Sequence, residues 1–139
     1  MEQYNIFYDN LILVPTVSFA VAVFLKWVSE WVKTGKINVK RALGSGGMPS
    51  VHAAVVVALA SAVALKAWVQ SDLFAIALSF TVIIIYDAMN VRFEAGLHAK
   101  AINAALWHKK FKESLGHLPS EAFAGSTLWI IVAVLLYAI

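Results

Sequence analysis

The chain has no cysteine and few charged residues, and each shortage excludes a class of protein. Without cysteine there is no disulfide framework, no thiolate nucleophile and no thiolate metal site. Charged residues make up only 14% of the 139 residues, whereas 61% are hydrophobic, and the mean hydropathy is +0.78. A soluble domain of this length needs more polar surface, so the composition predicts one integral membrane domain over residues 1–139.

Four segments lack charge over nearly the length of a membrane-spanning helix. A helix that crosses the hydrocarbon needs about 20 mostly apolar residues, and each segment reaches that length with its flanks. We therefore predict an all-α membrane bundle of four spanning helices, at residues 10–33, 49–68, 71–91 and 119–138. The segment at residues 97–114 is too polar to span, and we expect it to form a helix that lies in the membrane interface.

The basic residues predict how the helices are oriented. The loop after the first predicted span carries Lys33, Lys36, Lys40 and Arg41, and five more basic residues follow the third span, whereas the other side offers only Lys66. Cytoplasmic loops are enriched in lysine and arginine. We therefore expect both basic loops to face the cytoplasm and both termini to face outward, in an inner or plasma membrane.

Ionisable residues gather at the same predicted end of the bundle. Such groups are costly inside a membrane and usually face the bundle interior or a watery cavity, so their convergence indicates a site. Two of them, Asp87 and Arg92, could form a simple ion pair, or Arg92 could hold phosphate oxygens bidentately. The gathered residues are Lys26, Glu30, Lys33, His52, Asp87, Arg92, His117 and Glu121.

The stretch "GGMPSVHAA" places a histidine at the start of the second span. Gly46 and Gly47 allow the backbone to approach a ligand closely, and Pro49 suits the first turn of a helix. The free amides beside Ser50 form an anion site, and His52 could donate a proton there, which suggests phosphate chemistry. The alternative is an ordinary helix cap with a histidine bonded to backbone.

The stretch "GHLPSEAFAG" has a similar composition at the start of the fourth span. Glu121 follows His117 by four residues, so the two side chains share a face if the helical geometry reaches back that far. A carboxylate on one imidazole nitrogen fixes the tautomer and makes the other nitrogen a better nucleophile. The alternative is a cap formed by Ser120, with Glu121 stabilising the helix dipole.

Three stretches together resemble the divergent branch of the type 2 phosphatidic acid phosphatase superfamily, which is related to bacterial acid phosphatases and vanadium-dependent haloperoxidases. They are "GGMPSVHAA", "YDAMNVRFEAGLHAKAIN" and "LGHLPSEAFAG". The resemblance implies hydrolysis of a membrane phosphomonoester or diphosphate through a phosphohistidine, with no metal or other cofactor. It implies that the substrate is a phosphorylated lipid and that the protein contacts membrane lipids. A nucleic-acid partner is not expected.

The resemblance also implies roles for individual residues. His117 would be the nucleophile and Glu121 its partner, in the place of the superfamily's aspartate, and His52 would protonate the leaving oxygen. Phosphate contacts would come from Lys26, with Lys33 as the competitor, and from Arg41 and Arg92. Gly47 and Ser50 would add contacts at the helix start, and Asp87 a supporting carboxylate.

Two other functions use the same residues. The chain could bind anionic lipid headgroups or partner helices without catalysis, in which case His52 and His117 would be replaceable. A metal site of His52, His117 and a carboxylate is also conceivable, but the neighbouring lysines and arginines oppose a cation. Small residues along residues 53–62 allow close helix contact, so a homodimer is possible.

Overall fold

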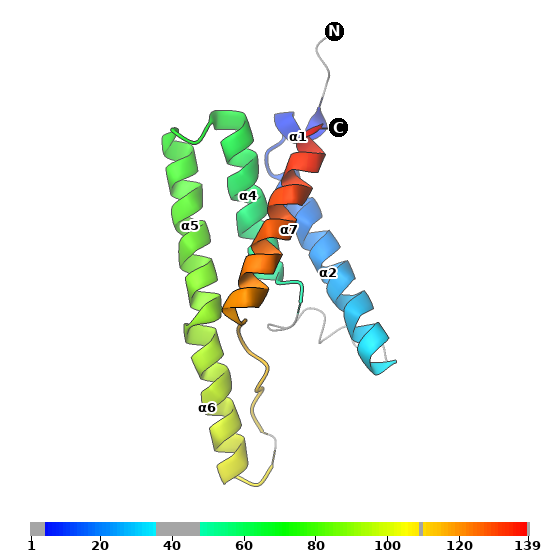
Figure 1. Cartoon of the computed structure of the whole chain (residues 1–139), viewed down its shortest axis with the longest axis vertical. Coiled ribbons are helices and arrows are strands. Elements are labelled where there is room, and N and C mark those ends of the chain that lie inside the picture. The colour runs from blue at the N-terminus through cyan, green and yellow to red at the C-terminus, as the bar shows by residue number, and fades with distance from the viewer. Residues whose placement is uncertain (1–4, 36–47, 109, 139) are drawn as a thin grey trace.

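The computed structural model describes residues 5–35, 48–108 and 110–138, and all the regular structure in these residues is helical. This confirms the predicted all-α fold, and the long helices lie close to the predicted spans (Figure 1). The helices are α1 (Ile6–Asp9), α2 (Leu13–Thr34), α4 (Val51–Ala67), α5 (Asp72–Met89), α6 (Val91–Ala105) and α7 (Pro119–Ala138).

Local signals explain where several helices begin and end. The Ser50 hydroxyl accepts a hydrogen bond from the backbone N–H of Ala53 at the start of α4, and Ser71 caps α5 in the same way through Phe74. Such caps satisfy amides that have no partner inside the helix. Gly35 ends α2 in the left-handed conformation that glycine adopts without strain.

Helix α4 lies at the centre of the bundle, where α2, α5 and α7 all pack on it. Its buried face consists of small residues such as Ala54, Ala58 and Ala62, which let the neighbouring helices approach closely. Within the described residues, three helical stretches are long and apolar enough to cross a membrane, namely α2, α5 with α6, and α7, whereas α4 is apolar but shorter, with 17 residues. The chain is thus an integral membrane helical bundle.

Helices α5 and α6 follow one another in the same direction (Figure 1). Residues 72–105 form a stretch of 34 residues, about 50 Å long at 1.5 Å per residue, which exceeds the roughly 30 Å of bilayer hydrocarbon. The helix that we expected at residues 97–114 therefore differs in its bounds, since it begins at Val91 and ends at Ala105. Its direction also differs, because Asn90 keeps a right-handed helical conformation at the junction and α6 continues α5 instead of turning aside.

After α6 the chain turns back toward the bundle as a non-helical return segment, residues 110–118. Asn103 of α6 holds its beginning. The Asn103 side-chain oxygen accepts from the backbone N–H groups of Lys110 (3.0 Å) and Phe111 (2.9 Å), and its nitrogen donates to the Phe111 carbonyl (2.7 Å) and the Glu113 carboxylate (2.8 Å). Because Asn103 is buried, these bonds fix the segment that leads to His117.

Helix α1 and the last turn of α7 lie at one end of the bundle, and the last turn of α2 and all of α6 lie toward the other end (Figure 1). At the α1 end, the Asn5 side chain donates to the Tyr137 carbonyl (2.9 Å) and Lys66 donates to the Tyr8 carbonyl (2.6 Å). These bonds tie α1 to α7 and α4. Lys33 and the described basic residues that follow α5, which belong to the two expected cytoplasmic regions, therefore lie away from α1.

Candidate functional site

His117 lies where the return segment meets the junction of α5 and α6. Its backbone N–H donates to the carbonyl of Ala88 (3.0 Å), near the end of α5, and its side chain is only 5% exposed. Gly116 just before it has a φ of +74°, and its backbone lies against Ala88 and Phe93, so that a Cβ there would be 2.8 Å from the Ala88 oxygen. A glycine is required by both the conformation and the close approach.

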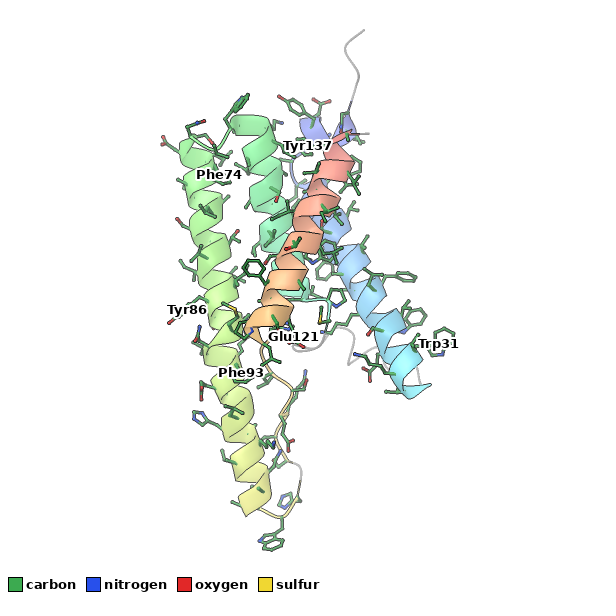
Figure 2. All side chains as sticks on the ribbon, in the orientation of Figure 1. Trp31, Phe74, Tyr86, Phe93, Glu121 and Tyr137 are labelled. Carbon is green, nitrogen blue, oxygen red and sulfur yellow. The ribbon has the colours of Figure 1, made fainter. Side chains whose placement is uncertain are left out.

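Glu121, in the first turn of α7, faces the His117 ring. Figure 2 shows Glu121 at the foot of α7, beside the return segment. One carboxylate oxygen of Glu121 accepts from the backbone N–H of Leu118 (3.0 Å) and lies 3.5 Å from Nδ1 of His117. That second distance suits an ion pair but is too long for a well-formed hydrogen bond, and Nδ1 has no hydrogen-bond partner among the described residues. Because α7 begins at Pro119, the helical geometry that this expectation required does not reach back to His117. The two side chains nevertheless face each other, with Nε2 as the nitrogen that does not face the carboxylate.

Arg92, in the first turn of α6, connects two other helices. Its Nε donates to a carboxylate oxygen of Asp87 (2.5 Å), near the end of α5, and its terminal nitrogen NH1 lies 3.0 Å from Nε2 of His52, in the first turn of α4. A guanidinium only donates, so Nε2 of His52 accepts and the proton of the neutral ring lies on Nδ1. Arg92 thus forms the expected ion pair and also contacts a candidate catalytic histidine.

Lys26 of α2 adds a cation to the same place. Its side chain is 7% exposed, and it lies close enough to His52 and His117 for its positive charge to act on both rings. Lys112 of the return segment lies close enough to repel Lys26. No feature of the sequence around Lys112 distinguishes it from the neighbouring lysines. Its position depends on how the return segment is anchored on α6, which is a tertiary property.

The two histidines themselves are neighbours, since His52 interacts electrostatically with His117. Burial lowers the pKa of His117 below its usual value, and the positive charges of Lys26 and Arg92 lower it further, while the Glu121 carboxylate offsets part of this change. The structure therefore favours a neutral His117 imidazole at neutral pH.

The remaining predicted site residues lie elsewhere or serve a structural purpose. Lys33 is exposed in the last turn of α2, seven residues beyond Lys26 and so about 10 Å along the helix. Ser50 is buried, and its hydroxyl is used as the cap of α4. Gly47 and Arg41 lie outside the described residues.

Metal ligands are not grouped in the part of the chain that the structure describes: no three His, Cys, Asp or Glu side chains there are placed to hold a metal ion. The site instead combines the His117 imidazole, which faces the Glu121 carboxylate, with the His52 imidazole, which contacts Arg92. The buried side chain of Lys26 adds a second cation. Such a set suits an anionic group, because donors of positive charge surround the point where the imidazoles meet.

These observations define a class, a helical membrane protein in which two histidines, a lysine and an arginine from separate helices and the return segment lie close together. The sequence matches the Divergent PAP2 family over residues 7–132, and the chain belongs to that family. It is also 32% identical, over 142 aligned positions, to the uncharacterized membrane protein YuiD of Bacillus subtilis (strain 168). The alignment covers 86% of this chain and 90% of that protein. No solved structure matches the chain.

Proposed function

We propose that the protein is a membrane lipid phosphatase that hydrolyses a phosphomonoester or diphosphate of a lipid through a phosphohistidine, without a metal ion. The observation that carries the proposal is the meeting of His52 and His117 with Lys26 and Arg92, which come from widely separated parts of the chain. Membership of the Divergent PAP2 family supports it. The site lies toward the end with the basic segments, so we assign it to the cytoplasmic face.

In the first step, Nε2 of His117 attacks phosphorus, the N–P bond forms and the bond from phosphorus to the lipid oxygen breaks. The imidazolium that results is stabilised by Glu121, whose carboxylate lies 3.5 Å from Nδ1. His52 donates a proton to the leaving oxygen of the lipid. Lys26 and Arg92 neutralise the phosphate oxygens, and because these donors are already in place, little rearrangement is needed as charge develops.

Arg92 has to change partner when a substrate binds. In the structure its donors are directed at Asp87 and His52. Phosphate oxygens are stronger acceptors for a guanidinium than a neutral imidazole nitrogen, so a bound phosphate draws NH1 away from His52. Nε2 of His52 is then free, and the nearby negative charge favours the protonated ring that the first step requires.

In the second step, a water molecule attacks the phosphorus atom of the phosphohistidine. His52, now neutral, takes a proton from the water, the N–P bond breaks, and phosphate and the His117 imidazole are released. The net reaction consumes one water and converts a lipid phosphate into the lipid alcohol, or a lipid diphosphate into the monophosphate. No electron transfer is involved.

The test is phosphate release from phosphatidate, phosphatidylglycerophosphate and isoprenyl phosphates in detergent micelles. We expect wild-type turnover that is inhibited by vanadate and survives EDTA. His117→Ala should reduce the rate to background, and His52→Ala should reduce it about 100-fold to 10,000-fold, the usual loss for a general acid. His108→Ala is the matched control, because His108 is exposed beyond α6 and bonds only to the Leu106 carbonyl among the contacts described.

Two results would contradict the proposal. One is a His117→Ala variant that retains the wild-type rate. The other is a wild-type protein that retains lipid through purification and never releases phosphate from it, which would favour lipid binding without catalysis.

A further inference from the structure

A cavity of about 400 Å³ lies between α4, α5 and α7, apart from the candidate site. It exists because α5 and α7 both pack closely on α4 but touch each other little, which leaves a groove between them. Small side chains of α4, Ala60, Ser61 and Ala64, form its floor. Its volume lies in the range of ordinary small-ligand sites, about 300–1,000 Å³.

The surface of the groove is chemically suited to hydrocarbon. Two of its three hydroxyl side chains have hydrogen-bond partners: Thr81 donates to the carbonyls of Val56 (3.0 Å) and Ala77 (2.8 Å), and Ser126 donates to the carbonyl of Ala122 (2.8 Å). These two groups therefore present little unsatisfied polarity to an occupant, and apart from Ser61 the other lining side chains are aliphatic or aromatic.

Measured along the helix axes, one end of the groove lies at nearly the same level as the candidate site. On α5 the lining residue Ile85 precedes Asp87 by two residues, about 3 Å along the helix, and on α4 Val57 follows His52 by five residues, about 8 Å. From Ile85 the groove extends to Phe74, about 16 Å farther along α5. Figure 2 places Phe74 near the end of the bundle opposite to Glu121.

The groove opens sideways, toward the surface that lipid surrounds. Leu78 on the α5 wall is 44% exposed and Ile130 on the α7 wall is 48% exposed. A helix with its side chains is 10–12 Å wide, so a segment as long as the groove would occupy on the order of 1,000 Å³, more than twice the space present. A single hydrocarbon chain is narrow enough to fit.

We propose that this groove holds one hydrocarbon chain of the substrate while the phosphate lies between His52 and His117. This inference rests on the proposed function and narrows its substrate class to phosphate or diphosphate esters with a chain long enough to run along α5. Chain length then contributes to recognition, because each methylene group in the groove makes van der Waals contacts with a fitted apolar surface.

The experiment compares dodecyl phosphate with butyl phosphate as substrates of the full chain in detergent micelles. Ala64→Phe fills the floor of the groove with a ring, and Ala75→Phe adds the same ring on an exposed part of α5 that does not line the groove. For Ala64→Phe we expect kcat/KM with dodecyl phosphate to fall about tenfold or more, because the ring takes the space of the chain and such overpacking costs about 1–3 kcal/mol. The rate with butyl phosphate should stay unchanged, and Ala75→Phe should change neither.

Each outcome separates this inference from the phosphatase proposal. If wild type hydrolyses both esters and Ala64→Phe hydrolyses dodecyl phosphate equally well, the groove does not bind the chain although the phosphatase proposal stands. If wild type hydrolyses neither, the phosphatase proposal itself fails. If Ala64→Phe loses both activities, Leu78→Trp on the exposed rim replaces it, and equal loss of both activities there contradicts the inference. A lower oligomer mass for Ala64→Phe in light scattering, with no change in chain preference, would assign the groove to a second copy of the chain.

Discussion

Replacing Gly116 by alanine should both destabilise the fold and displace His117 from the candidate site. Gly116 has a φ of +74°, where an L-residue costs about 1–2 kcal/mol. The new Cβ would also lie 2.7 Å from Cα of Phe93 and 2.8 Å from the Ala88 oxygen, both backbone atoms that cannot turn away. Overpacking of this kind costs about 1–3 kcal/mol. The backbone bond from His117 to Ala88 would be strained or lost as the return segment moves.

Gly35→Ala is the matched control for this prediction. Gly35 has a φ of +64°, but nothing lies within 4 Å of its Cβ position, so only the conformational cost of about 1–2 kcal/mol applies. The gain from a less flexible unfolded chain is similar in both variants and cancels in the comparison. The total expected for Gly116→Ala is about 2–5 kcal/mol.

The assay is denaturant unfolding in detergent micelles, together with phosphate release. Gly116→Ala should have a lower free energy of unfolding than Gly35→Ala by at least about 1 kcal/mol and should lose most of its activity, because His117 moves with its backbone. Gly35→Ala should keep wild-type turnover. Equal destabilisation of the two variants, or full activity in Gly116→Ala, would refute the argument from close packing.

Two further predictions concern charge. Burial holds the pKa of His117 below the unfolded value of about 6.5. The folding stability that comes from its neutral ring is therefore present above pH 6.5 and is lost as the pH falls through the folded-state pKa. The acid limb of kcat/KM should therefore lie below pH 6.5 and move lower still in Glu121→Gln, and a wild-type limb above 6.5 would contradict this. Asp87→Asn weakens the ion pair that positions Arg92. Because both side chains are 36% exposed, the loss of substrate binding energy should be about 0.5–2 kcal/mol. It should appear as a roughly 2-fold to 30-fold higher KM with little change in kcat. Asp72→Asn, at the far end of the same helix, should leave KM unchanged, and an equal effect of the two variants would show that the Asp87 contact does not position Arg92.

Much of the fold could be predicted because membrane helices are specified by local properties. Apolar length fixes each span, and serine or glycine residues such as Ser71 and Gly35 fix the ends, so the predicted bounds lie close to the observed ones. The direction of α6 could not be predicted in this way. Its polar, amphipathic sequence suits an interface helix, but the conformation of Asn90 and the hydrogen bonds of Asn103 decide that it continues α5.

The candidate site likewise has features that follow from local sequence and features that depend on tertiary packing. The spacing of four residues predicts a shared face for His117 and Glu121 only if His117 is helical, but α7 begins at Pro119. The tertiary bond of the His117 backbone to Ala88 therefore helps to place the ring beside Glu121. The packing of α2 decides whether Lys26 or Lys33 lies beside the histidines. The packing of the return segment brings Lys112 close to Lys26.

The sequence by itself therefore determined the membrane-spanning helices, their caps and the end of the bundle at which ionisable residues gather, because each depends on neighbours within a few turns. The tertiary structure alone decided the contact of Arg92 with His52, the backbone bond that holds His117 against Ala88 and the groove beside α4. These features depend on interhelical distances, which are set by how closely whole helices pack on one another and not by the sequence of any one of them.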